Sequence, residues 1–172
     1  MSDARSASAT SRYMLIIRGT QTVQPFDKSA LRDKLLSLEA ASAEETQRQF
    51  DTFLRGARLD QEGTVDSGDV SLSSQNASFA NQWDQQLDEH EAHRTLLQQI
   101  DFGAKTEVVP GALVKINQRY LVVAVPTTSF EFNGVEVLGI SLAAPLAKAM
   151  AGMSEGDTVK FNGKAMVIEQ VS

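Results

Sequence analysis

The chain of 172 residues contains no cysteine, which excludes disulfides and thiolate metal sites and gives no link to an oxidising compartment. Its 42% hydrophobic residues are enough for a modest core in one or two domains. The formal net charge of −6 and the pI near 4.9 disfavour direct binding to a nucleic-acid backbone. We therefore expect a globular, cytoplasmic protein without sequence-specific contacts to DNA or RNA.

Residues 1–26 are expected to stand apart from the domains that follow. Residues 1–12 are small and polar, a composition typical of a tail without a core. The apolar run 13–17 is typical of a short strand or a docking segment, and Gly19 and Pro25 interrupt the chain after it. This run is far shorter than the roughly 20 residues of a membrane helix or the roughly 7 to 15 of a signal-peptide core. We expect neither a membrane segment nor a targeting signal.

From residue 27 to about residue 59 the chain has no proline, and apolar side chains recur at intervals of three and four. They are Leu31, Leu35, Leu38, Phe50, Phe53 or Leu54, and Ala57. This spacing predicts an amphipathic helix. Asp27 is placed to cap its N-terminus, and Phe26 is placed to pack against Leu31. Residues 40–46 are only weakly apolar, so the middle of this helix is expected to pack thinly.

A second stretch repeats this spacing without glycine or proline. Its positions are Leu72, Phe79, Trp83, Leu87, His90, Arg94, Leu97 and Ile100. Each stretch has about 30 residues, which makes a rod of roughly 45 Å. Two rods of equal length joined by the polar linker 60–69 predict an antiparallel hairpin with a coiled-coil seam over residues 27–103 and its tip at 60–69.

Two pairs of side chains in the second helix allow two interpretations each. His90 and His93 lie one turn apart among the acidic residues 88, 89 and 91, a set that could bind a metal. Because no third ligand is fixed, seam and surface positions are the simpler interpretation. Phe79 and Trp83 at helical spacing predict packing in the seam. The alternative is that they are exposed anchors for a partner protein.

After Pro110-Gly111 the apolar period changes from 3.6 to 2, which indicates strands at 112–117, 119–126, 129–132, 135–141, 157–161 and 164–171. Asn133-Gly134 and Asn162-Gly163 predict type I′ hairpins, because both turn positions accept a positive φ. Pro145 to Ala151 predicts one short helix that ends before Gly152. We expect residues 104–172 to form a compact antiparallel β domain with a single helix, so the fold class is α+β.

The stretch SLAAPLAKAMAGMSEGD, residues 141–157, resembles the C-terminal signature of the Gre transcript cleavage factors. The residues that match are Ser141, Pro145, Leu146, Ala147, Ala149, Gly156 and Asp157. Ala144 stands where the family usually has a serine, which removes a helix N-cap worth about 1 kcal/mol. Ala151 is smaller than the usual apolar residue. The resemblance covers roughly residues 27–172 and implies a helical hairpin followed by an FKBP-like β domain.

The resemblance also implies a partner and a mode of action. The β domain of the family docks at the rim of the secondary channel of bacterial RNA polymerase, and the hairpin enters that channel to modulate elongation. The residues implied to bind polymerase are Ser141, Pro145, Leu146, Lys148, Gly156 and Asp157. The chain has no Ser-His-Asp set, P-loop or dinucleotide fingerprint, so we expect at most stimulation of the polymerase's own transcript cleavage. The alternative from another class is a non-catalytic coiled-coil adaptor or chaperone-like interaction protein.

The chemistry of the family lies at the hairpin tip, in a motif of Gly-Asp, two residues and Glu-Asn-Ala. Gly68-Asp69 matches its start, but Leu72 stands at the Glu position, and alignment on Asn76-Ala77 places Gln75 there instead. The tip acids that could assist the metal of the polymerase are Asp60, Glu62, Asp66 and Asp69. Either alignment lacks one carboxylate of the family pair.

Mg²⁺ in proteins is typically held by one or two carboxylates plus waters, so Asp66 and Asp69 could converge on an ion shared with the polymerase. We expect no metal or cofactor held stably by this chain alone. The other interpretation is that these are solvated turn acids, with Asp69 as an N-cap. Because the Glu is missing, we favour a regulator that occupies the channel and stimulates cleavage poorly.

Overall fold

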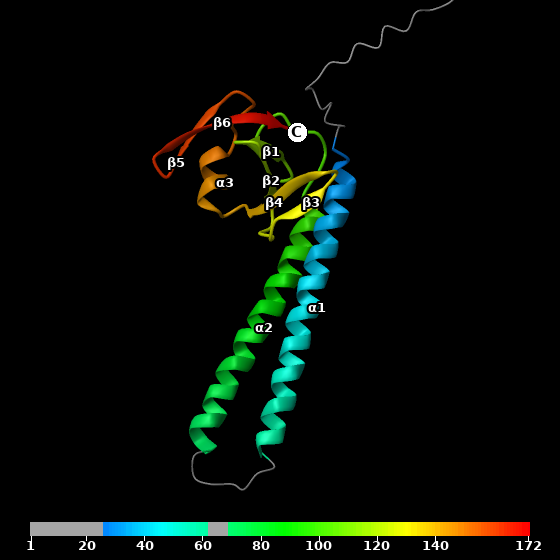
Figure 1. Cartoon of the computed structure of the whole chain (residues 1–172), viewed down its shortest axis with the longest axis vertical. Coiled ribbons are helices and arrows are strands. Elements are labelled where there is room, and N and C mark those ends of the chain that lie inside the picture. The colour runs from blue at the N-terminus through cyan, green and yellow to red at the C-terminus, as the bar shows by residue number, and fades with distance from the viewer. Residues whose placement is uncertain (1–25, 62–68) are drawn as a thin grey trace, which may run out of the picture.

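The computed structural model describes residues 26–61 and 69–172 (Figure 1). Of residues 57–61, 69–78 and 80 it describes the backbone alone. The expected strand or docking segment at 13–17 lies outside the described residues, as do Glu62 and Asp66.

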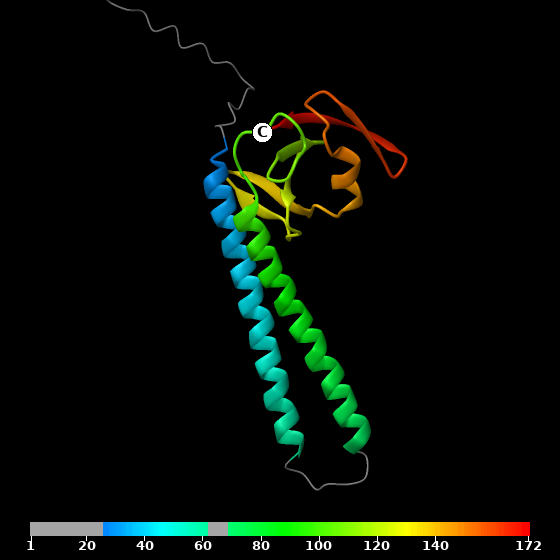
Figure 2. The same cartoon turned by 180° about the vertical axis from the view of Figure 1, so that it is seen from behind.

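Two long helices run side by side in opposite directions, as both views show (Figures 1 and 2). They are α1 (Lys28–Gln61, 34 residues) and α2 (Asp69–Gln99, 31 residues), about 51 and 46 Å long at 1.5 Å per residue. The predicted hairpin is confirmed, but its linker is shorter than predicted, because Asp60 belongs to α1 and Asp69 is the first residue of α2. No helix among the described residues is long and apolar enough to cross a membrane.

Aromatic side chains pair across the outer half of this hairpin. The rings of Phe50 and Trp83 lie 6.3 Å apart between centroids, and those of Phe53 and Phe79 lie 5.6 Å apart. Packing in the seam is therefore confirmed for Phe79 and Trp83. Phe79 nevertheless keeps 48% of its surface exposed.

The N-terminus of α1 forms as the sequence predicts. The Asp27 carboxylate accepts hydrogen bonds from the backbone N–H of Ser29 at 3.0 Å and of Ala30 at 3.1 Å. These bonds satisfy donors that have no partner inside the first turn of a helix. Phe26 packs against the buried cluster that contains Leu31, and its ring lies 5.1 Å from that of Tyr120.

The rest of the chain forms one six-stranded sheet and one short helix. The strands are β1 (Leu113–Ile116), β2 (Arg119–Ala124), β3 (Phe130–Phe132), β4 (Val135–Ser141), β5 (Thr158–Phe161) and β6 (Lys164–Val171). Their order across the sheet is β3-β4-β2-β1-β6-β5, and α3 (Pro145–Met150) follows β4. The α+β class is confirmed.

The predicted turns are confirmed at both Asn-Gly pairs. Asn133 and Gly134 have φ values of 51° and 77°, and Asn162 and Gly163 have 50° and 75°. Positive φ at both positions is what a type I′ turn requires. The turn 117–118 between β1 and β2 has the same signs, 49° and 63°, although it contains no glycine.

The prediction of a wholly antiparallel sheet is wrong at one pair of strands. β2 and β4 run parallel, with Tyr120 beside Val137 and Ala124 beside Ser141, while the other strand pairs are antiparallel. Residues 125–129 reverse the chain, so that β3 lies at the sheet edge and β4 returns between β3 and β2. Local turn signals specify the β3–β4 and β5–β6 hairpins, but they do not specify which strand the β3–β4 hairpin pairs with.

The sheet buries a cluster on each face. Side chains of β2 alternate between them, with Val122 in the first cluster and Val123 in the second. The first cluster includes residues from the base of the hairpin, namely Leu31, Leu35, Leu97 and Ile100. The second includes Ala147 and Met150 of α3. The hairpin base and α3 therefore pack on opposite faces of the sheet, and the hairpin projects away from it (Figure 1).

Candidate functional site

The far end of the hairpin carries the acids predicted to serve the polymerase. Asp60 is in the last turn of α1 and Asp69 begins α2, so their backbones lie at the end of the hairpin opposite to the sheet (Figure 1). Asp69 belongs to the helix rather than preceding it, which is not the position expected for an N-cap. Glu62 and Asp66 lie outside the described residues. Whether the tip carboxylates converge therefore stays a prediction.

The C-terminal motif begins at the end of β4 and continues through α3. The Ser141 hydroxyl accepts a hydrogen bond from the Ala143 N–H at 3.2 Å. Ala144 precedes the helix without a side-chain cap, as expected for the missing serine, and Pro145 opens the first turn. Pro145 and Lys148 are exposed, whereas Ser141 and Leu146 are half-buried. Of the four residues in this half of the motif that are predicted to bind polymerase, Pro145 and Lys148 are therefore the exposed ones.

The end of the motif shapes a turn. Gly156 has φ +91°, and its N–H donates to the Ile168 carbonyl at 2.8 Å. The Asp157 carboxylate accepts the Ser154 N–H at 2.8 Å. Glycine adopts this φ without strain, so Gly156 and Asp157 have a structural role that explains their place in the motif. Both are also exposed.

A pocket of about 560 Å³ opens between β2, β4 and α3. Tyr120, Leu138, Leu146 and Met166 contribute its apolar wall, and Glu136 contributes a carboxylate. Leu146 belongs to the C-terminal motif, so the motif adjoins this pocket.

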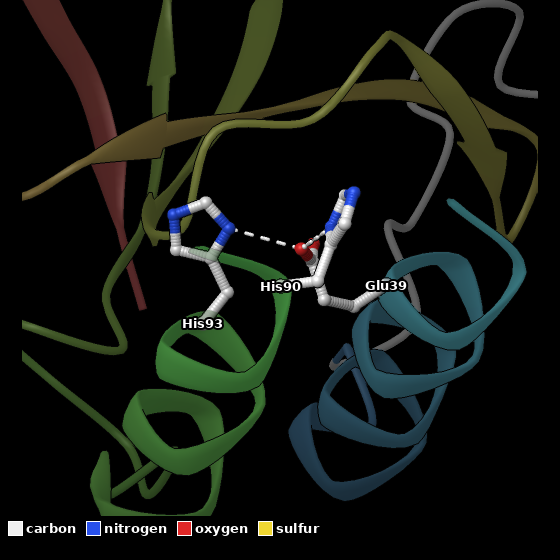
Figure 3. A group of neighbouring side chains, drawn as sticks. All are labelled: Glu39, His90 and His93. Carbon is white, nitrogen blue, oxygen red and sulfur yellow. Dashed lines mark hydrogen bonds and ion pairs between the residues drawn. The ribbon is translucent and has the colours of Figure 1, made fainter. Parts of the chain in front are cut away.

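The hairpin seam brings together three side chains that the sequence does not place side by side (Figure 3). Glu39 of α1 has 4% of its surface exposed, and its Oε1 lies 2.7 Å from Nδ1 of His90 and 2.9 Å from Nδ1 of His93. Of these three residues, the two histidines are predicted from the sequence and Glu39 is not. The available signal is that Glu39 follows Leu35 by four residues, on the buried stripe of the helix.

His90 has a second contact on its other ring nitrogen. Its Nε2 lies 3.3 Å from the hydroxyl of Thr46, which is buried on the same face of α1 as Glu39, seven residues further along the helix. A hydroxyl both donates and accepts hydrogen bonds, so this contact is compatible with either tautomer of the ring.

A buried amine joins the hairpin to the sheet. Lys28, with 9% of its surface exposed, donates hydrogen bonds to the carbonyls of Gly103 at 3.2 Å and Gly111 at 2.9 Å, and to that of Ser172. Burial lowers the pKa of Lys28 from 10.5 to about 8, and the charge of Lys105 acts in the same direction. This contact has no signature in the sequence, because the partners of Lys28 are backbone groups far along the chain.

No known family model and no curated protein matches this chain. Among solved structures, the GreA factor homolog 1 (Gfh1) protein of Thermus thermophilus matches with 14% identity and a TM-score of 0.30, over 83% of this chain and 93% of that one. A structure of the transcription factor Gfh1 matches with 16% identity and a TM-score of 0.29, over 83% of this chain and 91% of that one. At these TM-scores the likeness carries no weight for function, which we infer from the residues of this chain.

Proposed function

We propose that this chain is a Gre-type transcription factor that binds bacterial RNA polymerase in the cytoplasm and inserts its helical hairpin into the secondary channel. The observation that carries the proposal is the motif 141–157, which resembles the Gre signature at seven positions and forms a strand end, a short helix and a glycine turn. In this proposal the hairpin is a coiled coil over residues 27–103, the β domain over residues 104–172 is FKBP-like, and residues 1–26 are separate.

The dimensions of the hairpin support this mode of action. Helices of 34 and 31 residues make a two-helix rod of about 46 to 51 Å that projects from the sheet. A rod of this shape is suited to reach deep into a channel while a globular domain stays at the rim. The shared buried cluster at its base, which includes Leu35 and Val122, fixes the direction of the rod relative to the sheet.

We propose that the β domain binds polymerase through the motif. The residues assigned to this contact are Ser141, Pro145, Leu146, Lys148, Gly156 and Asp157. Pro145 and Lys148 are exposed and available for direct contact, and the two half-buried residues support the helix that carries them. The net charge of −6 favours docking on a basic surface, so binding is expected to weaken as salt is added.

The tip decides between stimulation of cleavage and occupation of the channel. Its acids offer the oxygen ligands that Mg²⁺ prefers, but Leu72 or Gln75 replaces the Glu of the family motif. We propose a regulator that fills the channel, stimulates cleavage poorly and has no catalytic activity of its own. Asp66 and Asp69 are the residues that would approach an ion shared with the polymerase, with Asp60 and Glu62 nearby in the sequence.

A binding and cleavage assay with purified bacterial polymerase tests the proposal. The protein should co-migrate with core polymerase in gel filtration, slow nucleotide addition, and release little cleaved RNA from backtracked complexes. The Asp66→Asn/Asp69→Asn variant should bind polymerase as tightly as the wild type and slow nucleotide addition to the same extent. The matched control, Asp33→Asn/Glu44→Gln, removes the same charge from exposed positions on α1.

Two other results would redirect the proposal. Efficient cleavage by the wild type that disappears in the tip variant would make this a working cleavage factor with a rearranged tip. Absence of binding to polymerase, together with recovery of other complexes from cells, would favour a coiled-coil adaptor or chaperone-like protein.

A further inference from the structure

We propose that Glu39, His90 and His93 form a binding site for a divalent transition-metal ion of the Zn²⁺ class, which joins the two helices of the hairpin. One ligand atom from each of the three side chains lies within 4.8 Å of the others. Two imidazoles and one carboxylate are a ligand set that Zn²⁺ and related ions prefer over Mg²⁺ or Ca²⁺. This inference does not depend on the proposed function, because the site lies in the seam and its test contains no polymerase.

The ligands come from facing helices, as in other metal sites inside helical bundles. Glu39 reaches from α1 between the two rings of α2, and both rings turn an Nδ1 atom toward the same carboxylate oxygen (Figure 3). The i, i+3 spacing of the histidines puts both on one face of α2. The three side chains thus point to a common centre rather than outward to solvent.

The distances between the ligand atoms are slightly shorter than those around a bound ion, so the cluster would have to open slightly to bind one. Tetrahedral Zn²⁺ with bonds of about 2.0 to 2.1 Å keeps its ligand atoms about 3.3 Å apart. The present nitrogen-to-oxygen distances are 2.7 and 2.9 Å, so side-chain rotations that add about half an ångström would admit the ion. Three protein ligands leave one tetrahedral position for water or another ligand.

Burial distinguishes this cluster from surface acids. The Glu39 side chain is 5% exposed, and those of His90 and His93 are 21% and 26% exposed. A carboxylate removed from water needs either hydrogen-bond donors or a cation beside it. The two rings supply donors when both carry a proton on Nδ1, and a divalent ion would supply the cation when both offer their Nδ1 lone pairs.

Thr46 completes the arrangement for the metal-bound state. When Nδ1 of His90 binds the ion, the proton of the ring is on Nε2 and can be donated to the Thr46 hydroxyl, 3.3 Å away. Such a bond fixes the tautomer and ring orientation of a metal-binding histidine, and its loss typically lowers metal affinity about 10-fold to 100-fold. Thr46 is therefore a positioning residue in the proposed site.

Titration of untagged protein with ZnCl₂ by calorimetry tests the site. The wild type should bind one equivalent, and its melting temperature should rise with Zn²⁺ but not with Mg²⁺. His93→Gln and Glu39→Gln should each lower the affinity at least about 10-fold, and Thr46→Val by about 10-fold. Glu91→Gln, which removes an exposed carboxylate from the same turn of α2, should bind as the wild type does.

The proposal would be overturned by wild-type protein that shows neither calorimetric binding nor a shift in melting temperature. Equal Zn²⁺ affinity in the wild type, His93→Gln and Glu39→Gln would also overturn it, because the ion would then be held elsewhere, for example by exposed acids. Should the variants fail to fold, the absorption spectrum of the Co²⁺-loaded wild type decides. Intense visible bands of a tetrahedral nitrogen-ligated ion support the site, and the spectrum of hydrated Co²⁺ contradicts it.

Discussion

Lys28 Nζ lies 2.9 Å from the carbonyl oxygen of Gly111, and this hydrogen bond ties the first turn of α1 to the loop before β1, 83 residues later. The same ammonium group also reaches the carbonyl of Gly103, four residues after the end of α2, and that of Ser172. Four separate parts of the chain thus meet at one buried amine, at the junction that sets the direction of the hairpin.

Lys28→Met should lower the free energy of unfolding by about 1 to 3 kcal/mol at neutral pH, because it leaves buried carbonyls without a donor. Urea unfolding followed by circular dichroism measures the change. Lys34→Met, at an exposed position of the same helix, should change stability by less than about 0.5 kcal/mol. Equal stability of the two variants would show that the junction does not depend on this amine.

The stability contributed by Lys28 should rise with pH between about 8 and 10.5. The pKa of Lys28 is lowered to about 8 in the folded protein from its ordinary value of 10.5, because burial disfavours the charged form. In this window the unfolded chain binds more protons than the folded one, so the free energy of unfolding increases with pH. The difference between wild type and Lys28→Met, measured in urea at pH 7, 8, 9 and 10, should therefore grow. A constant or shrinking difference would contradict this prediction.

Two glycines should respond to alanine in opposite directions. A Cβ atom at Gly139 in β4 would lie 2.5 Å from the Val125 carbonyl oxygen and 2.7 Å from the Thr127 hydroxyl, so Gly139→Ala should cost about 1 to 3 kcal/mol. At Gly56 in α1 a Cβ would meet nothing within 4 Å. Gly56→Ala should stabilise by about 0.5 to 1 kcal/mol, because alanine favours the helix. Thermal unfolding of both variants checks the two signs, and a stable Gly139→Ala would mean that β4 can move away from residues 125–127.

The outer half of the hairpin should exchange its amide hydrogens faster than the base. Leu31, Leu35 and Leu97 are fully buried at the base, whereas no side chain is buried between residues 47 and 56. Helical segments with few buried contacts open locally at a lower free energy. Hydrogen exchange followed by mass spectrometry should show protection that falls from residues 31–39 to residues 47–56. Uniform protection along α1 would instead indicate that the aromatic pairs hold the outer half as firmly as the core holds the base.

Lys148→Glu should weaken binding to RNA polymerase by about 2-fold to 10-fold, because the proposed contact at α3 places Lys148 opposite an acidic group of the polymerase, unlike the basic surface that attracts the chain as a whole, and one exposed charge pair is worth about 1 kcal/mol. The position is exposed on α3, within the motif that the proposal assigns to the polymerase. Lys164→Glu, an equally exposed reversal beside the β5–β6 turn, is the control and should leave affinity unchanged. Fluorescence anisotropy with labelled protein measures both. Equal changes in affinity for the two variants would point to the net charge of the chain rather than to a contact at α3.

The sequence by itself determined the elements whose signals are local. The Asn-Gly turns at 133 and 162, the Asp27 cap and the spacing of Leu31 and Leu35 each act within a few residues, so the two hairpin turns, the start of α1 and its buried face could be predicted from the sequence. The strands on either side of the β1–β2 turn are also predicted from the sequence. The positive φ values of Asn117 and Gln118 in that turn are not, because the turn contains no glycine. Propensity and periodicity are sufficient where the interacting residues are neighbours in the chain.

Only the tertiary structure decided which distant segments meet. The parallel pairing of β2 with β4 depends on the route of residues 125–129, and no turn signal encodes it. Glu39 lies 51 and 54 residues before His90 and His93 in the chain. Their contact depends on the register between α1 and α2, which is set by the packing of their buried faces and not by a local signal. The partners of Lys28 are backbone carbonyls, which every residue has, so the sequence does not show which of them the side chain bonds to. The proposed metal site and the junction are therefore properties of packing, because their groups come together only when helix register and sheet order are fixed.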